Sequence, residues 1–151
     1  MPTIYDAPEE YDKLLDSEKA ALQKWIELAC VHTGTKWSEY TSYQIKHAFE
    51  SVGFYVTNGQ FKGAMFAAGY FVKDIKAQNW IMDVGTTCTH RPRISRKTNY
   101  PVITFECPYG YPPALFPLCH ATHEQHIELA KLVEVAIRED DLRRSLAQKE
   151  A

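Results

Sequence analysis

The chain has the length and composition of a single globular domain, with room for one helical appendage. It contains 151 residues, of which 45% are hydrophobic and 24% are charged, and these values exclude disorder over most of the chain. No apolar run is long enough to cross a membrane, and the acidic N-terminal stretch lacks the basic start and apolar centre of a signal peptide. We therefore expect a cytoplasmic protein without a membrane partner.

The net charge of −2 conceals three segments of different sign. Residues 1–34 carry three basic residues (Lys or Arg) and seven acidic residues (Asp or Glu). Residues 35–98 carry nine basic and four acidic residues, and residues 99–151 carry five basic and eight acidic residues. The middle of the chain is therefore basic and its ends are acidic. This distribution is expected of a protein that presents one face to phosphate groups, although small clusters of solvated surface charge give the same pattern.

The first expected element is an amphipathic helix from Ser17 to about His32. Its apolar residues recur at helical spacing: Leu22, Trp25, Ile26 and Ala29. Ser17 is of a type that caps helix starts, and Gly34 is able to adopt the left-handed conformation that ends a helix. The sequence therefore predicts a core helix near the N-terminus.

Two shorter helices are expected next, joined by a tight link. Residues that favour helix termini mark both helices. The first helix is expected to start at Thr41 or Ser42 and to end at Gly53. The second is expected to start at Thr57 or Asn58 and to end at Gly69. Residues 70–72 and 80–84 have the composition of strands, and the polar residues 73–79 between them are expected to form a hairpin loop. Residues 41–84 are therefore predicted to form a helix–turn–helix with a two-stranded wing.

The rest of the chain carries weaker signals. Residues 86–99 are expected to form a basic loop, residues 101–106 a strand, and residues 107–118, with four prolines, an irregular aromatic segment. Thr122 and Gln125 form a capping box that opens a helix running to about Ala147. A helix of this length either wraps the core or pairs with a copy of itself, and the lack of sustained heptads favours wrapping.

These elements predict a mostly helical α+β fold. It has a winged helix-turn-helix core, an N-terminal helix, a small antiparallel sheet and a long C-terminal helix. The expected organisation is residues 1–85 for the N-terminal helix and the winged-helix unit, residues 86–121 for the loop, strand and proline-rich segment, and residues 122–151 for the last helix. The protein is expected to be a monomer, or a homodimer joined through that helix.

The winged-helix unit also carries a resemblance to known proteins. The pattern is Ser42-Tyr43-x-Ile45-Lys46-His47-x-Phe49-Glu50, then Tyr55-Val56-Thr57-Asn58-x-x-Phe61-Lys62-Gly63-Ala64-Met65, then Ala68-Gly69-Tyr70 and Asn79-Trp80. It resembles small uncharacterised proteins of phages and other mobile elements, and it is more loosely similar to the winged-helix module of virus-type primase–helicases. The resemblance implies a fold rather than a function. The chain departs from the primase–helicases because it lacks a Gly-rich phosphate loop with Lys-Ser/Thr, so no ATPase activity is expected.

A nucleic-acid site is expected at the second helix of the helix–turn–helix, whose N-terminal residues lie nearest the base edges in this class. The candidates there are Thr57, Asn58, Gln60 and Lys62, and Gly59 and Gly63 would allow close backbone approach. Phosphate contacts are expected from Lys46, Lys73, Lys76, Arg91, Arg93, Arg96 and Lys97. The alternative interpretation is that Thr57 and Asn58 only cap the helix, that Gly63 permits helix packing and that the lysines serve solubility.

The cysteines and histidines offer a second, weaker constellation. Four cysteines in a reducing compartment predict free thiols and no disulfide. Zinc prefers four Cys or His ligands, and the candidates are Cys107, Cys119, His123 and His126, within a wider group that includes Cys88, His90 and His120. Their spacing matches no standard zinc finger, so no cofactor is expected. Cys107 and Cys119 are not accompanied by the nucleophile-elbow motif of hydrolases or by an acidic residue placed to orient a catalytic histidine. No enzymatic activity is therefore expected either.

Two functions remain open from the sequence. The first is a small non-catalytic mobile-element protein that binds DNA or RNA as a regulator or replication accessory. The second is a protein-binding inhibitor directed against a host complex, with Tyr109, Tyr111, Leu115 and Phe116 presented to the partner.

Overall fold

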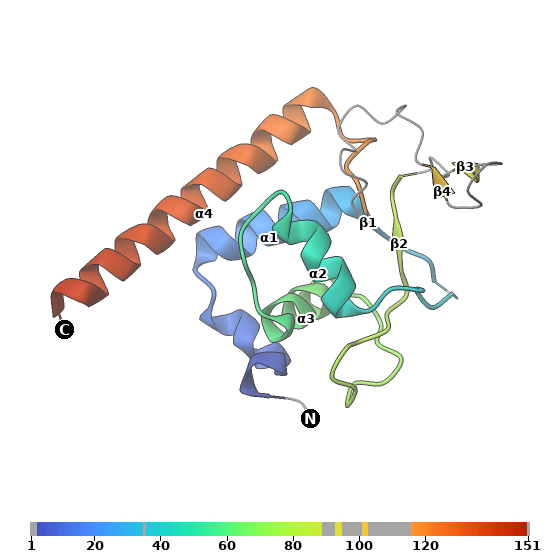
Figure 1. The fold of residues 1–151 in the computed structure, drawn as a ribbon, viewed down its shortest axis with the longest axis horizontal. Coiled ribbons are helices and arrows are strands. Elements are labelled where there is room, and N and C mark those ends of the chain that lie inside the picture. Colours follow the sequence, from blue (N-terminus) through green and yellow to red (C-terminus); the bar gives the residue numbers. More distant parts are fainter. Residues whose placement is uncertain (1–2, 35, 89–92, 95–100, 103–115, 151) are drawn as a thin grey trace.

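The protein is built mainly from helices around one hydrophobic core (Figure 1). Our computed structural model describes residues 3–34, 36–88, 93–94, 101–102 and 116–150. The elements in chain order are the 3-10 helices η1 (Ile4–Asp6) and η2 (Pro8–Lys13), α1 (Asp16–Ala29), β1 (Cys30–His32), α2 (Ser42–Glu50), α3 (Asn58–Ala67), β2 (Val84–Thr86), β3 (Arg93–Ile94), β4 (Pro101–Val102) and α4 (His123–Glu150). The predicted mostly helical fold with a small antiparallel sheet and a long C-terminal helix is confirmed at this level.

Helix α1 is shorter than the sequence predicts. It ends at Ala29, because Cys30–His32 leaves the helix and pairs as β1 with β2. Its start is not capped by Ser17 as predicted; the Glu18 carboxylate accepts a hydrogen bond of 2.8 Å from the Leu15 backbone N–H instead. Gly34 does have a positive φ of +80°, but it lies beyond β1 rather than at the helix end.

The two short helices agree with the prediction in position and in the capping of their starts, but Gly53 does not end α2 as predicted, because the helix stops at Glu50 and Gly53 does not have a positive φ. Thr41 and Gln44 form a capping box at the start of α2, and Thr57 and Gln60 form one at the start of α3. Each box satisfies backbone N–H groups that have no partner within the helix. Gly69 follows α3 with a φ of +89°, a conformation that favours glycine, so it ends this helix as expected.

The sheet is less regular than the predicted wing. Val72 and Met82 form an isolated bridge rather than part of a two-stranded ladder, so the winged helix-turn-helix is not confirmed. Side chains replace backbone partners here: the Asp83 carboxylate accepts a hydrogen bond of 2.8 Å from the Phe71 N–H, and the Ser42 hydroxyl accepts one of 3.0 Å from the Trp80 N–H. The ladder is therefore interrupted on both flanks of residues 80–84.

The longest ladder among the described residues joins segments that are distant in sequence. Cys30–His32 (β1) pairs antiparallel with Val84–Thr86 (β2), and Thr41 bridges to Ile81 further along the same edge. Residues 80–86 thus lie between residues 30–41 and residues 71–73, which makes this segment the centre of an irregular sheet.

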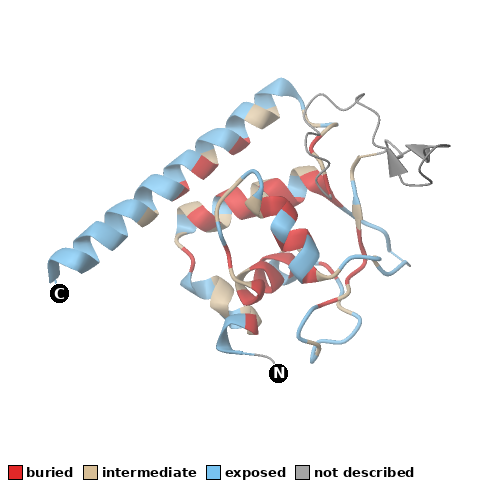
Figure 2. Cartoon of the chain, in the orientation of Figure 1, coloured by how far each residue is buried: buried red, intermediate tan, exposed pale blue. Residues whose placement is uncertain are grey.

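The core lies where α1, α2 and α3 meet this sheet (Figure 2). The Trp25 ring packs edge-on against Phe49 and Phe61, with centroid distances of 5.7 Å and 6.2 Å. Trp25, Phe49, Phe61 and Trp80 are all almost completely buried. Aromatic side chains of this size dominate the burial that stabilises a small domain.

Helix α4 packs on the core over only part of its length. The predicted capping box is confirmed, since the Thr122 N–H donates to Gln125 and the Gln125 N–H donates to the Thr122 hydroxyl. Leu129, Val133 and Ala136 are buried along the first half of the helix, which packs on α1. Every residue from 141 to 150 is exposed, so the expectation that the helix wraps the core holds only for its first half (Figure 2).

The segment between β2 and α4 is described in part. Arg93–Ile94 (β3) pairs antiparallel with Pro101–Val102 (β4), so two short strands lie where a loop over 86–99 and a strand over 101–106 were predicted. Thr86, at the start of the predicted loop, belongs to β2, and residues 87–88 follow it; the rest of both predictions, and the irregular segment up to residue 115, lie outside the described residues. None of the helices within the described ranges combines the length and apolar character that a bilayer crossing requires.

Candidate functional site

The predicted base-reading residues at the start of α3 are not on an exposed face. Asn58 and Lys62 are 7% and 3% exposed. The Asn58 amide N–H₂ donates to the Asp6 carboxylate at 3.0 Å and to the Gln78 carbonyl at 2.9 Å, and the Asn58 amide oxygen accepts from the Ser42 hydroxyl at 3.0 Å. The prediction that Asn58 reads bases is therefore wrong for this arrangement, because its amide is already satisfied inside the protein.

Lys62 is held within the same network. Its ammonium group donates to the backbone carbonyl oxygens of Asp6 and Gln78, both at 2.9 Å, and lies 4.8 Å from the centroid of the Trp80 ring. Burial lowers the pKa of Lys62, and the nearby Asp6 carboxylate acts in the opposite direction. Lys62 thus joins the N-terminal segment to α3 and to the 77–78 turn instead of facing a nucleic acid.

The N-terminal 3-10 helices are what cover α3. Both η1 and η2 pack on it, and a Cβ atom at Gly59 would collide with the carbonyl oxygen of Ala7. At Gly63 a Cβ atom would meet the carbonyl oxygen of Pro8 and the Tyr11 side chain. Gly59 and Gly63 were expected to allow close approach of a nucleic acid, but the N-terminal segment of the chain itself packs against them. This agrees with the alternative interpretation that Gly63 permits helix packing.

Asp6 is the acidic partner in this network. Burial acts to raise its pKa, but hydrogen bonds from Thr3 and Asn58 and the charge of Lys62 outweigh that effect, so its pKa lies below the ordinary value. The carboxylate therefore stays ionised at neutral pH. A buried charge that is hydrogen-bonded on several sides fixes the positions of the surrounding segments relative to one another.

The other candidates near the helices fall into two groups. Thr57 and Gln60 serve the capping box of α3, which is the alternative that the sequence left open for Thr57. Lys46 is 3% exposed, forms an ion pair of 2.8 Å with Glu50, and lies over the rings of Tyr43 and Tyr55. Its predicted role as a phosphate contact is wrong because the ammonium group is enclosed by these neighbours.

Exposed lysines and aromatic rings remain beside the central segment 80–84. The predicted phosphate contacts Lys73 and Lys76 are exposed, and so is Lys36 on the opposite flank. The Trp37 side chain is 42% exposed and Phe71 is 70% exposed. We name Lys36, Trp37, Phe71, Lys73 and Lys76 the lysine–aromatic rim. Of the remaining basic candidates, Arg91, Arg96 and Lys97 lie outside the described residues, and Arg93 is described only through the backbone of β3.

Sequence reasoning missed a cluster of ionisable groups at the edge of the sheet. The His32 ring stacks on Tyr70 with a centroid distance of 3.9 Å, and its Nδ1 atom lies 3.6 Å from a carboxylate oxygen of Asp83. Asp83 is 4% exposed, and burial raises the pKa of the Tyr70 hydroxyl. No local motif marks these residues, because β1 and the 80–84 segment meet only in the folded chain.

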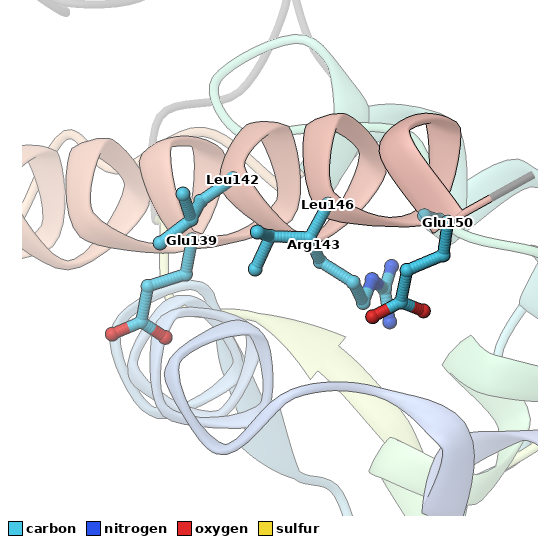
Figure 3. Close-up of a pocket in the computed structure, with 6 residues that line it drawn as sticks. Glu139, Leu142, Arg143, Leu146 and Glu150 are labelled. Atoms are coloured by element: carbon cyan, nitrogen blue, oxygen red, sulfur yellow. The ribbon is translucent and has the colours of Figure 1, made fainter.

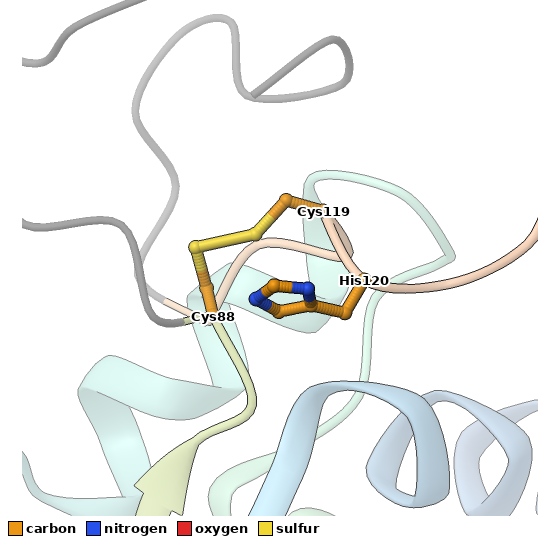
Figure 4. A group of neighbouring side chains, drawn as sticks. All are labelled: Cys88, Cys119 and His120. Atoms are coloured by element: carbon orange, nitrogen blue, oxygen red, sulfur yellow. A yellow bond between two sulfur atoms is a disulfide. The ribbon is translucent and has the colours of Figure 1, made fainter. Parts of the chain in front are cut away.

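The cysteines depart from the prediction of free thiols. Cys88 and Cys119 form a disulfide, and the His120 imidazole lies beside it (Figure 4). Cys30 is a free, buried thiol whose pKa is raised by burial, so the prediction of a free thiol is confirmed for this residue.

Two of the predicted zinc ligands lie elsewhere. His123 is an exposed residue at the start of α4, and the Nε2 atom of His126 lies 3.1 Å from the Leu118 carbonyl oxygen. Cys107 lies outside the described residues. Among the described members of the predicted set, Cys119 alone takes part in the Cys/His cluster that the fold assembles.

The residues predicted for a protein partner are only partly described. Phe116 is 5% exposed and packs edge-on against Tyr40 at 6.2 Å, so it is not presented to a partner. Tyr109, Tyr111 and Leu115 lie outside the described residues. A different apolar surface exists on the exposed half of α4, where a hollow of about 420 Å³ is lined by Glu139, Leu142, Arg143, Leu146, Ala147 and Glu150 (Figure 3).

Comparison with known proteins leaves the site to be interpreted from its own chemistry. The resemblance to mobile-element proteins and to the primase–helicase module rests on the sequence pattern and stays a prediction. No family model matches this chain, and no curated protein or solved structure matches it either.

Proposed function

We propose that this chain is a small non-catalytic nucleic-acid-binding protein that contacts single-stranded DNA or RNA through the lysine–aromatic rim. The observation that carries the proposal is the placement of two exposed lysines and two exposed aromatic side chains on the two segments that flank residues 80–84, with a third exposed lysine, Lys76, on the loop that follows residues 71–73. A regulatory or replication-accessory role follows from such binding. The contact surface proposed here replaces the N-terminal end of α3.

The two flanks of the rim are close enough to contact one ligand. The Ser38 N–H donates to the Met82 carbonyl at 2.8 Å, and the Lys73 N–H donates to the Ile81 carbonyl at 2.9 Å. Neighbouring strands lie about 4.8 Å apart, so the flanking segments lie about 10 Å apart across the central one. Rings and ammonium groups on both flanks are therefore within reach of the same few nucleotides.

Single strands suit this surface better than a duplex. Exposed aromatic rings stack on unpaired bases whatever the sequence, while lysines neutralise the backbone phosphates. A duplex would require a helix end that enters the major groove, and the start of α3 is covered by η1 and η2. The order of helix, strand, two helices and hairpin loop supports an irregular winged helix in which residues 74–79 take the place of the wing.

The test is a salt series of binding to fluorescent single-stranded and duplex oligonucleotides, read by anisotropy. For single strands each phosphate contact contributes about 0.7 to the slope of log K against log salt, so the combined variant Lys36→Ala, Lys73→Ala, Lys76→Ala should reduce the slope by about 2. Lys131→Ala removes an exposed lysine on α4 and should leave the slope unchanged. Binding that is absent, or that ignores salt, contradicts the proposal.

The aromatic contribution is tested separately. Trp37→Ala and Phe71→Ala should each weaken single-strand binding by about fivefold or more, because stacking on one base contributes about 1–3 kcal/mol. Tyr5→Ala is the matched control, since Tyr5 is 59% exposed but belongs to η1. Equal losses in all three variants would point to non-specific association rather than to the rim.

Protein binding is the second candidate function, and the exposed half of α4 favours it. Leu142 and Leu146 are 60% and 51% exposed and line the hollow shown in Figure 3. Apolar residues on one stripe of an unpacked helix are suited to a second copy of that helix. Sedimentation over a range of concentrations should then show a dimer that Leu142→Glu with Leu146→Glu abolishes, whereas a monomer at all concentrations contradicts this candidate.

A further inference from the structure

The fold brings together three side chains with metal-binding chemistry that no sequence motif connects. Cys88 follows β2 and Cys119 precedes α4, with a sequence separation of 31, and His120 lies next to them (Figure 4). We propose that, in the reduced protein, the thiolates of Cys88 and Cys119 and the imidazole of His120 bind one zinc ion. The same two sulfur atoms then alternate between a zinc site and the Cys88–Cys119 disulfide.

The spacing of the ligand atoms suits a single ion. The two Sγ atoms and a ring nitrogen of His120 all lie within 4.8 Å of one another. Zinc binds thiolates at about 2.3 Å and imidazole at about 2.0–2.1 Å, so its tetrahedral ligand atoms lie about 3.5–3.8 Å apart. Reduction of the disulfide lets the two sulfur atoms separate to this spacing, and rotation of the three side chains then brings all the ligand atoms around one ion.

The backbones that carry the cysteines are fixed before any metal binds. Beside Cys88, the Thr87 N–H donates to the Ala29 carbonyl at 3.0 Å, and the Thr87 hydroxyl donates to the Leu28 carbonyl at 2.8 Å. These bonds anchor the end of β2 to the C-terminal end of α1. A ligand held on a formed element loses little further conformational freedom when it coordinates an ion.

The turn that holds Cys119 and His120 is anchored in the same way. The Ala121 N–H donates to the Leu118 carbonyl at 3.1 Å, and the Nε2 atom of His126 lies 3.1 Å from the same oxygen. His120 is exposed and Cys119 is partly exposed, so an ion and a reductant reach the cluster from the side of these two residues. The site is thus positioned by its scaffold and open to exchange.

The donor set selects the kind of ion. Two thiolates and one imidazole are soft ligands that favour zinc over magnesium or calcium, which prefer oxygen. Three protein ligands leave one position of a tetrahedral ion for water or another donor. The cluster therefore fits zinc, and cobalt(II) serves as its spectroscopic substitute.

The change between the two states is balanced in atoms and electrons. A dithiol reductant transfers two electrons and two protons to the Cys88–Cys119 bond, which breaks to two thiols while the reductant becomes a disulfide. Zinc then displaces both thiol protons and bonds to the two sulfur atoms. A disulfide oxidant reverses the sequence: zinc leaves, the two thiolates lose two electrons as the sulfur–sulfur bond re-forms, and the oxidant is reduced to two thiols by these electrons and two protons from solvent. The end of β2 is joined to the start of α4 in both states, by the disulfide in the oxidised protein and by the shared zinc ion in the reduced protein.

The test uses the full chain, purified without a histidine tag and reduced in metal-free buffer. Anaerobic titration with cobalt(II) should give the strong visible bands of a tetrahedral complex and a thiolate-to-cobalt charge-transfer band, both saturating at one equivalent and both removed by zinc. Cys88→Ser and Cys119→Ser should each lower the charge-transfer band by at least half, because each variant removes one of the two thiolates. His120→Ala should weaken cobalt binding by at least about tenfold, since even the loss of a partner that only orients a metal ligand costs that much. The oxidised protein should bind no cobalt in this manner.

Two control variants separate this site from other Cys and His residues. Cys30→Ala removes the buried free thiol, and His123→Ala removes an exposed histidine at the start of α4. Both variants should bind cobalt as the original chain does. Circular dichroism of each variant checks that the helices are retained. The proposal is overturned if the reduced chain gives no tetrahedral cobalt spectrum, or if a folded Cys88→Ser variant keeps the full charge-transfer band.

Discussion

The ammonium group of Lys62 donates a hydrogen bond of 2.9 Å to the backbone carbonyl oxygen of Asp6, which lies 56 positions earlier in the chain. This contact joins η1 to α3 and removes from the surface a lysine that the sequence pattern assigned to a nucleic acid. The same ammonium group also donates to the carbonyl oxygens of Ala77 and Gln78. Lys62, on α3, is thus hydrogen-bonded to both η1 and residues 77–78 and links these three segments.

Lys62→Met keeps most of the side-chain volume and removes the charge and the three donors. The carbonyl oxygens then lose a buried partner, so the free energy of unfolding should fall by about 1–3 kcal/mol. Urea denaturation followed by circular dichroism measures it. Lys73→Met, at an exposed position, is the control and should change stability by less than about 0.5 kcal/mol. Unchanged stability in Lys62→Met would show that the network does not support the fold.

Gly63→Ala should loosen the N-terminal segment. The new Cβ atom meets the Pro8 carbonyl oxygen and the Tyr11 side chain, and such overpacking costs about 1–3 kcal/mol. Hydrogen exchange should speed up at residues 4–13 while α1 stays protected. Gly34→Ala is the matched control: its φ of +80° makes alanine unfavourable, but no atom lies within 4 Å of the added carbon. Exchange at residues 4–13 should therefore stay unchanged in that variant.

Asp6 should make stability fall in acid. Its pKa in the folded chain lies below the ordinary value of 3.8, so its contribution is fully present above that pH and is lost as the pH falls through the lower, folded value. Urea denaturation of the original chain and of Asp6→Asn at several pH values should show a stability difference that is constant near neutrality and shrinks below pH 3.8. A difference that widens in acid would contradict the assignment of an ionised Asp6.

Asp83 should matter more as an acceptor than as a charge. Its carboxylate accepts the Phe71 N–H at 2.8 Å in place of a regular ladder bond. Asp83→Ala leaves that donor without its acceptor and should cost about 1–3 kcal/mol of unfolding free energy. Asp83→Asn retains an oxygen of the same geometry and should cost clearly less, as measured by urea denaturation. Equal losses would assign the effect to the lost negative charge.

The features that sequence predicted well are local ones. The capping boxes of Thr41 with Gln44 and Thr57 with Gln60 depend on residues three positions apart, so the pattern alone locates the starts of α2 and α3. The start of α4 follows for the same reason. The end of α1 could not be located in this way, because Cys30–His32 leaves the helix to pair with residues more than 50 positions later.

The surface properties of α3 were predicted wrongly for a related reason. Asn58 and Lys62 have the residue types of a base-reading helix, and their burial depends on a segment 52 and 56 positions earlier. Nothing in the composition of residues 3–13 marks them as a cover for α3. The approach of Cys88 to Cys119 and of His32 to Asp83 is equally non-local, so neither cluster has a signature in the sequence.

The bond between Cys88 and Cys119 also closes a covalent ring of the chain that contains residues 89–118. A single cut of the backbone anywhere within this ring leaves the two fragments in one molecule. The fragment that bears α4 is released only after a reductant has opened the disulfide and the contact of α4 with α1 has been lost. Under oxidising conditions the body of the protein and its last helix therefore stay covalently joined after a single cut within residues 89–118.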